Sequence, residues 1–359
     1  MDTLNISDGS KPLDFKKIWK EAVTKLGHST IIVTGKTGVG KSTLINAVFS
    51  KDVAETGVGK PITNQIKEYS VSNFPISIID TIGLELENFQ PIKEKLIEEI
   101  TNRRNDPDPN KHVNVCWYCI NYGSGRIEPA EISFLDELSK FVKVIVVLTQ
   151  AYDIEDSLFY NEIEKQLYNT NIKILKLVAL KKYGVTPYSL DKLVAITEEL
   201  LPEAQKSAFA AAQKVRIDLK VKKAHLIVAG AATSAGAVGA IPVPFSDAVA
   251  LVHIQISMLA GISATMGLEF SDGFLKTLIA SSLGPTAATL GGKALVTGLL
   301  KLIPGVGCIG SIISAATAAG LTTGLGEAYI KVLQTMLLNN LEITPENVSE
   351  ALRNECAKK

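Results

Sequence analysis

The chain has 359 residues, which is enough for two or three domains with sizeable cores. Its 37 basic and 37 acidic residues balance, so the overall charge does not point to a nucleic-acid partner. Four scattered cysteines argue against a disulfide framework, and the polar N-terminal segment lacks the apolar stretch of a secretory signal, so we expect a reducing, cytoplasmic environment.

The first predicted element is an amphipathic helix over residues 15–26, within an N-terminal part that we assign to 1–28. From residue 29 onward, apolar strands alternate with helices. The predicted strands cover 29–35, 66–72, 75–80, 113–121, 142–149 and 172–180, and the predicted helices cover 42–49, 91–102, 128–141, 157–168 and 189–201. This alternation predicts an α/β domain over 29–202, with a mostly parallel six-stranded sheet flanked by helices. Ligands of such sheets bind beyond the carboxyl ends of the strands.

The pattern changes after Pro202, where helices alone follow. A basic helix is predicted over 203–224, and apolar stretches rich in Ala, Gly, Ser and Thr come next. A last helix begins after Thr344, with a proline at its first position. We therefore assign an all-α hydrophobic domain to 203–338 and a tail helix to 339–359.

A glycine-rich segment joins the first strand of the α/β domain to its first helix. Residues 35–42 read Gly-Lys-Thr-Gly-Val-Gly-Lys-Ser, which matches the pattern G-x-x-x-x-G-K-[ST] in full. The glycines let backbone N–H groups turn toward phosphate oxygens, Lys41 brings a positive charge to the β- and γ-phosphates, and Ser42 offers a hydroxyl to Mg²⁺. The predicted phosphate-contacting residues are Gly35, Lys36, Thr37, Gly38, Val39, Gly40, Lys41, Ser42 and Thr43.

With this loop, residues 29–201 resemble the Ras-like P-loop GTPases of the Era and septin-like branch. The resemblance implies GTP and GDP as ligands and Mg²⁺ as the cofactor. It also implies that Asp80, in Asp80-Thr81-Ile82-Gly83, holds Mg²⁺ through water and that the Gly83 N–H contacts the γ-phosphate. Thr63 is the candidate for the switch threonine that closes on Mg²⁺, and Thr56 is the competing choice in the Gly-rich polar loop 54–65. The catalytic candidates are Lys41, Thr63 and Gly83, and the metal-binding candidates are Ser42, Thr63 and Asp80.

The base-reading segment departs from the family pattern. The family has N/T-K-x-D after a buried strand, whereas this chain has Thr149-Gln150-Ala151-Tyr152-Asp153, with Gln in place of Lys and Asp one position late. Two interpretations of Asp153 stay open. Either it accepts hydrogen bonds from guanine, or it only begins a helix, and Thr149 and backbone groups recognise the base. Ala179 is the candidate for the backbone N–H that contacts guanine O6.

Two substitutions bear on hydrolysis. Leu84 follows Gly83 in the region where Ras carries the glutamine that orients the attacking water, and its side chain can neither donate nor accept a hydrogen bond. Thr37 and Gly38 stand where potassium-dependent relatives have a proline and an asparagine. We therefore expect a GTPase with slow intrinsic hydrolysis. Dimerisation through the α/β domain, which is the G domain of such GTPases, or binding of a partner would raise the rate.

Three stretches of the helical domain carry almost no charge: 226–245, 248–268 and 302–326. Their lengths suffice to span a bilayer, but their small and hydroxylated residues would make insertion marginal. The domain resembles a family of uncharacterised hydrophobic helical domains that are often fused to such GTPases and often called membrane-associated. Two alternatives stay open for 226–326: a soluble bundle, or a bundle that contacts or enters a membrane, with the basic segment 214–223 facing the anionic surface.

The motif Cys116-Trp117-Tyr118-Cys119 is a C-x-x-C inside an apolar strand. Neither a second pair at zinc spacing nor a histidine cluster accompanies it, so we expect core packing rather than metal or redox chemistry.

These features predict a GTP-binding protein whose helical domain couples the nucleotide state to a membrane or a protein partner. The alternative is a nucleotide-stabilised interaction or membrane-scaffold protein that hydrolyses little, and an ATPase is a more distant third. The expected partners are guanine nucleotide, a second copy through the G domain, and a membrane through the helical domain, with no nucleic acid.

Overall fold

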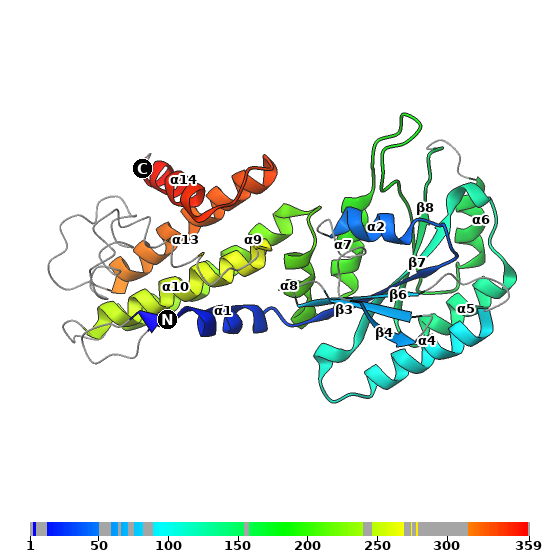
Figure 1. Ribbon diagram of the computed structural model, residues 1–359, viewed down its shortest axis with the longest axis horizontal. Helices are drawn as coiled ribbons and strands as arrows, with labels where there is room; N and C mark the ends of the chain where they lie inside the picture. The colour runs from blue at the N-terminus through cyan, green and yellow to red at the C-terminus, as the bar shows by residue number, and fades with distance from the viewer. Residues whose placement is uncertain are drawn as a thin grey trace. The chain divides into compact units, whose positions relative to one another are not determined.

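The computed structural model describes residues 3–4, 13–49, 59–63, 66–70, 75–81, 89–153, 158–239, 246–268, 274, 278 and 315–357. Contacts divide the chain into two compact units. The sheet unit is Leu26–Arg216, and the helical unit combines Met1–Lys25 with Ile217–Lys359. The predicted combination of an α/β fold with a hydrophobic helical part is confirmed (Figure 1).

The sheet unit contains seven described strands, in the order β4-β5-β6-β3-β7-β8-β9. Their bounds are β3 Ser29–Gly35, β4 Gly59–Thr63, β5 Ile66–Ser70, β6 Ile76–Thr81, β7 Val113–Asn121, β8 Lys143–Thr149 and β9 Lys173–Lys176. The pairs β3–β6, β3–β7, β7–β8 and β8–β9 are parallel, whereas β4–β5 and β5–β6 are antiparallel. All six predicted strands are present. The seventh, β4, lies at the edge, inside the segment 54–65 that composition predicts to be a loop.

Helices cover both faces of the sheet (Figure 1). Their bounds are α2 Lys41–Val48, α4 Phe89–Arg104, α5 Pro129–Ser139, α6 Leu158–Gln166, α7 Leu190–Leu200 and α8 Glu203–Ala212, with single turns at η2 Pro109–Lys111 and η3 Tyr122–Ser124. Side chains of α4, α5 and α6 share one buried cluster with strand residues such as Ile32 and Tyr118. On the opposite face, α2 packs on β3, α7 on β7, and α8 on β3 and β6.

Strand β7 shows how the two faces are filled. Successive side chains of a strand point to opposite faces, and Cys116 belongs to the cluster beneath α4, α5 and α6. The next residue, Trp117, donates its indole N–H to Thr197 of α7 at 3.0 Å and stacks on Phe49 with 5.8 Å between ring centroids. Cys119 follows Cys116 by an odd number of residues, so the two buried thiols lie on opposite faces of the strand. Burial raises the pKa of both thiols, and the expected core packing is confirmed.

The predicted basic helix 203–224 is interrupted between α8 and α9 (Ile217–Gly239), so this prediction is wrong. Gln213 closes the break, because its side-chain oxygen accepts from the Arg216 N–H at 2.7 Å and its amide donates to the Arg216 carbonyl at 2.8 Å. These bonds replace the helical hydrogen bonds of an unbroken chain. As a result α8 packs with the sheet, whereas α9 belongs to the helical unit.

The helical unit is built from long helices that pack side by side. Their bounds are α1 Phe15–Thr24, α9 Ile217–Gly239, α10 Ser246–Met266, α13 Ala315–Leu338 and α14 Pro345–Ala357, with a short antiparallel pair of β1 Thr3–Leu4 and β2 Leu13–Asp14. Asp14 caps α1 by accepting from the Lys17 N–H at 2.9 Å, and Thr344 caps α14 by accepting from the Asn347 N–H at 3.2 Å. Within the unit, α9 packs on α10 and α13, α1 on α10, and α14 on α13.

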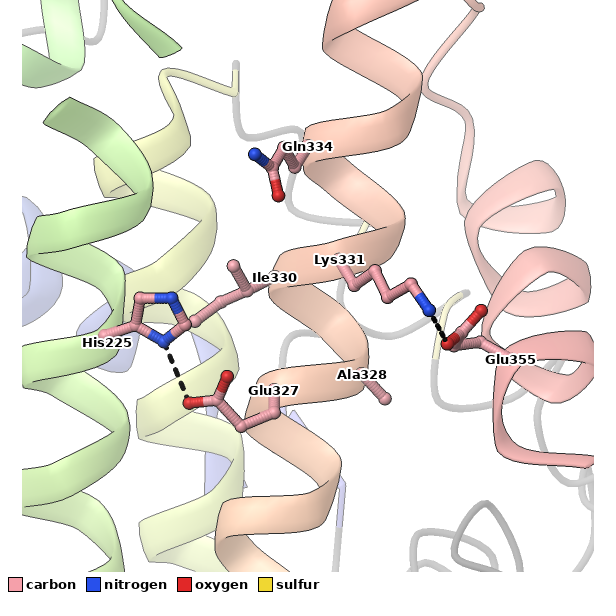
Figure 2. A pocket seen from close by; sticks show the side chains of 7 residues that line it. All are labelled: His225, Glu327, Ala328, Ile330, Lys331, Gln334 and Glu355. Carbon is pink, nitrogen blue, oxygen red and sulfur yellow. Dashed lines mark hydrogen bonds and ion pairs between the residues drawn. The ribbon is translucent and has the colours of Figure 1, made fainter. Parts of the chain in front are cut away.

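A polar pocket of about 320 Å³ lies among α9, α13 and α14 (Figure 2). Across it, His225 of α9 bonds to Glu327 of α13 at 2.9 Å, and Lys331 of α13 pairs with Glu355 of α14. These two contacts join the three helices across the pocket.

The predicted ability of the apolar stretches to span a bilayer finds no support in the described helices. Within the described ranges, which leave out 240–245 and most of 269–314, every helix is too short or too polar to cross a membrane. Parts of 226–245 and 302–326 lie outside these ranges. Membrane contact therefore stays a proposal.

Lys220 is a charged residue of the basic segment 214–223, and the structure buries it. It is 5% exposed, and its ammonium donates to the Met266 carbonyl at 3.0 Å, near the end of α10. Burial lowers the pKa of Lys220 to about 7. The basic segment 214–223 thus loses one of the charges expected to face an anionic surface.

The free energy of unfolding is expected to rise between pH 7 and pH 9 through Lys220. In this window the unfolded chain keeps the proton, since its lysine pKa is near 10.5, whereas the folded protein releases it. Stability then increases with pH, by about 2 kcal/mol across the window. Thermal unfolding at both pH values should show this rise in the wild type and in the exposed control Lys222→Met. An equal rise in Lys220→Met would contradict the assignment.

Candidate nucleotide-binding site

The glycine-rich loop occupies the turn between β3 and α2, as predicted. Gly35, Gly38 and Gly40 have φ of +136°, +76° and +96°, values that other residues rarely adopt. Gly40 is the N-cap of α2, so the first N–H groups of the helix face outward at the positive end of the helix dipole. The backbone is therefore shaped to bind an anion.

Lys41 lies across this loop. Its ammonium donates to the carbonyl oxygens of Gly35 and Lys36, both at 2.9 Å. The next residues, Ser42 and Thr43, are exposed in the first turn of α2. A cation and two hydroxyls thus stand at the N-terminus of a helix, where a phosphate chain would bind.

Asp80 lies next to the loop. It is the last residue of β6 that pairs with β3, and its partner there is Val33. Its Oδ1 is buried and has no hydrogen-bond partner among the residues that the structure describes. Burial raises the pKa of Asp80 to about 6, against the attraction of Lys41 and Lys67. A buried acceptor of this kind fits a cation, and with the Ser42 hydroxyl it supplies the oxygen ligands that Mg²⁺ prefers.

The switch candidates are only partly within the described residues. Thr63 ends β4, where it pairs with Ile66 of β5, and Ile66 pairs in turn with Thr81. The backbone register therefore sets Thr63 two strands away from Thr81, the residue after Asp80. Thr56, Gly83 and Leu84 lie outside the described residues.

The last residue of β8 and the residue that follows it contact the phosphate loop directly. The Thr149 hydroxyl bonds to the carbonyl of Val39, and the Gln150 amide donates to the Gly38 carbonyl at 3.0 Å. Gln150, the residue that replaces the expected lysine, thus bridges the base-reading segment and the phosphate loop. Asp153 is exposed at the end of this segment.

The segment after β9 lies beside the one after β8. The Leu177 N–H donates to the Leu148 carbonyl at 2.9 Å, and the Ala151 N–H donates to the Leu177 carbonyl at 3.3 Å. Ala179, which follows, is half-buried. The structure therefore brings the phosphate loop, Thr149 and the segment of Ala179 to the same edge of the sheet.

Glu131 is a site neighbour that the sequence does not reveal. It is 4% exposed in α5 and pairs with Lys36 of the loop at 2.9 Å, and the Tyr118 hydroxyl donates to it at 3.2 Å. Glu131 also closes the capping box of α5 with Glu128. Glutamate three residues after a helix start is a recognisable capping signal, but the link to Lys36 depends on the packing of α5 and could not be foreseen.

Two family profiles match separate parts of the chain. Residues 30–150 match the family described as 50S ribosome-binding GTPase, and residues 203–354 match a domain of unknown function, DUF697. The first match spans the phosphate loop, Asp80 and Thr149, which the structure gathers at one edge of the sheet.

Individual relatives also match only part of the chain. Septin-9 of Rattus norvegicus is 31% identical over 34% of this chain and 26% of its own length. Magnetosome membrane protein 22 of Magnetospirillum gryphiswaldense is 35% identical over 27% of this chain and 51% of its own length. The chain thus spans about a quarter to a half of these relatives. The crystal structure of a probable GTP-binding protein engB aligns with a TM-score of 0.36 at 21% identity, over 48% of this chain and 98% of that one.

The geometry and the profiles lead to the same assignment. A complete phosphate loop stands at a strand-to-helix turn, and an acidic residue with a buried carboxylate oxygen lies near the end of the neighbouring strand. The chain therefore carries a P-loop GTPase domain of the first family, followed by a helical domain of the second.

Proposed function

We propose that this protein binds GTP with Mg²⁺ and hydrolyses it slowly, as a switch that the helical unit couples to a membrane or protein partner. The observation that carries the proposal is the position of Asp80 next to the phosphate loop. Its carboxylate has a buried oxygen with no hydrogen-bond partner among the described residues. Lys41 and the loop N–H groups bind the phosphates. Ser42 and Asp80 hold Mg²⁺, which when bound neutralises charge on the β- and γ-phosphates.

The remaining site roles rest on the resemblance. Thr63 would close on Mg²⁺ when a γ-phosphate is present, the Gly83 N–H would contact the γ-phosphate, and Ala179 would contribute a backbone N–H to the base. Leu84 supports slow hydrolysis, because its side chain cannot orient a water molecule. A second copy bound through the G domain, or another partner, would then supply the missing group.

A chain of contacts supports coupling to the helical unit. Helix α2 begins at the phosphate loop and ends at Val48, whose carbonyl accepts from the Lys214 N–H at 2.9 Å. The Lys214 ammonium also bonds to the Asn46 carbonyl at 2.6 Å, and Phe49 forms a bridge with Gln213. The chain enters α9 shortly after these residues. One short helix thus links the phosphates to the segment that leads into the helical unit.

The domain assignment and the membrane partner are also part of the proposal. We assign nucleotide binding to 29–202 and coupling to 203–338, with the helices of 1–28 and 339–359 as accessory parts. A membrane contact through 226–326 draws support from the three nearly charge-free stretches 226–245, 248–268 and 302–326 and from the name of magnetosome membrane protein 22.

Calorimetric titration with GTP, GDP and ATP analogues, with and without Mg²⁺, tests the binding step. GTP is expected to bind more tightly than ATP. Lys41→Ala should weaken GTP binding at least tenfold, since hydrogen bonds to charged groups contribute about 1.5–3 kcal/mol each. The exposed control Lys165→Ala should bind as the wild type does. Equal affinity of Lys41→Ala and wild type would defeat the proposal.

Single-turnover hydrolysis with and without anionic vesicles separates the switch from the scaffold. A slow basal rate that rises with vesicles or protein concentration supports the switch. Tight binding without turnover in either condition would support the scaffold, the alternative that Leu84 and the irregular segment 149–153 leave open. Fast turnover by the dilute protein alone would contradict slow intrinsic hydrolysis.

A further inference from the structure

The residue at which the family pattern has the base-reading aspartate is Tyr152, because Asp153 comes one position late. Tyr152 follows Thr149 and Gln150, whose side chains bond to the phosphate loop. A base joined to phosphates in that loop would extend past these residues along the carboxyl ends of the strands. Tyr152 is the first aromatic residue of the chain after the two residues that bond to the phosphate loop.

A tight hairpin from the neighbouring loop brings a second tyrosine to Tyr152. Val178 and Tyr188 pair at its base, and Lys182 pairs with Val185 at its tip. The two residues between them, Tyr183 and Gly184, have φ of +51° and +79°. Two left-handed residues define a type I′ turn, in which asparagine followed by glycine is favoured and a bulky side chain in the first place is unfavourable.

The strained residue is also exposed. Tyr183 is 75% exposed, and its ring meets the Tyr152 ring edge to face, with 5.2 Å between centroids and 89° between planes. The Lys182 ammonium lies 4.7 Å from the centre of the Tyr183 ring. The hairpin is fixed beside Tyr152, because the Tyr188 hydroxyl donates to the Ala151 carbonyl at 2.8 Å. Strain at an exposed aromatic residue is typical of a binding position.

We propose that Tyr152 and Tyr183 form an aromatic platform that binds the purine base of the nucleotide, and that this platform supplies most of the base affinity. The inference rests on the proposed nucleotide binding and adds how the base is bound. Stacking on aromatic rings is tolerant of base identity, because every base has a π face. The platform therefore accounts for purine binding despite the irregular segment 149–153, with weaker discrimination of guanine from adenine than an aspartate would give.

Calorimetry with GDP and with inorganic tripolyphosphate tests the platform on the full chain. Tyr183→Asn installs the favoured I′ residue, so the hairpin keeps its turn while the ring is lost. This variant and Tyr152→Ala should bind GDP about tenfold more weakly or worse, as expected for the loss of one base–aromatic stack, and should bind tripolyphosphate normally. Tyr183→Phe should retain GDP affinity. The matched control Tyr168→Ala removes a tyrosine that is 82% exposed elsewhere in the unit, and it should bind as the wild type does.

The outcomes distinguish this inference from the proposed function. If the wild type binds neither GDP nor tripolyphosphate, both the proposed function and the aromatic platform are overturned. If the wild type binds GDP and Tyr183→Asn binds it equally well, only the platform is overturned. If the tyrosine variants keep their GDP affinity but lose self-association, the two rings form a contact between copies of the chain. This outcome also overturns the platform.

Discussion

Replacing Gly35 by alanine is expected to destabilise the sheet around the phosphate loop by about 3–5 kcal/mol, beyond what most single substitutions cost. A Cβ at Gly35 would lie 2.2 Å from the Cys119 carbonyl oxygen and 3.1 Å from its carbon. Gly35 pairs with Cys119 where β3 and β7 run side by side, so the clash is with backbone that cannot rotate away. Its φ of +136° adds strain for any residue with a side chain.

Gly38→Ala is the matched control for this prediction. Gly38 also has a positive φ, of +76°, but no described atom lies within 4 Å of the position of its Cβ. The Gly38→Ala substitution should lower the free energy of unfolding by about 1–2 kcal/mol, which is the cost of the left-handed conformation alone. Hydrogen–deuterium exchange of the nucleotide-free full chain should show faster exchange in β3 and β7 for Gly35→Ala than for Gly38→Ala. Equal exchange in the two variants would show that the contact with Cys119 is unimportant.

Replacing Asp80 by asparagine should abolish the effect of Mg²⁺ on nucleotide affinity and lower hydrolysis about a hundredfold. At the same time the Mg²⁺-free protein should be as stable as the wild type or more so, by up to about 2 kcal/mol. The reason is that one oxygen of the wild-type carboxylate is buried with no hydrogen-bond partner among the described residues, and burial raises the pKa of Asp80 to about 6. Asparagine removes this buried charge, at the smaller cost of an unpaired amide.

Two measurements test this prediction together. GTP titrations with and without Mg²⁺ report the metal, and denaturant unfolding in chelator reports the stability. Asp136 is an exposed carboxylate in α5. Asp136→Asn should leave both the effect of Mg²⁺ on GTP affinity and the stability within ordinary error of the wild type. A strongly destabilised Asp80→Asn protein would mean that Asp80 stabilises the fold itself, rather than the bound cation.

The sequence predicts the sheet unit well because its signals are local. Apolar runs such as 29–35 and 142–149 read as buried strands without knowledge of their neighbours. Strand β4 is different: it contains a glycine and a proline, and it forms because β5 is there to pair with it. Pairing across the sheet overrides a local preference for loop.

In the helical segments, too, contacts between residues far apart in sequence override the local preference. Residues 203–224 are rich in good helix formers, which predicts one helix. The break at Gln213 is made by a side chain that bonds to Arg216 and by the pairing of Gln213 with Phe49, which lies far away in sequence. Burial of Lys220 is likewise invisible in a single sequence, because a lysine on a helix is usually solvated.

At the site, the phosphate loop was predictable because its glycines and lysine are contiguous. Gln150 and Glu131 were not, although each bonds to the loop. Their partners lie far away in sequence, and a neutral amide in the place of a lysine carries no motif. What pattern recognition misses here is the contact between motifs, rather than the motifs themselves.

The two tryptophans of the chain are divided between the two units. Trp19 lies half-buried in α1 of the helical unit, and Trp117 is fully buried in β7 of the sheet unit, stacked on Phe49. Indole fluorescence shifts to longer wavelength when water reaches the ring. Replacing Trp19 by phenylalanine would therefore leave an optical signal from the sheet unit alone. The chain thus carries a natural pair of probes, through which the melting of each half can be watched without an added dye.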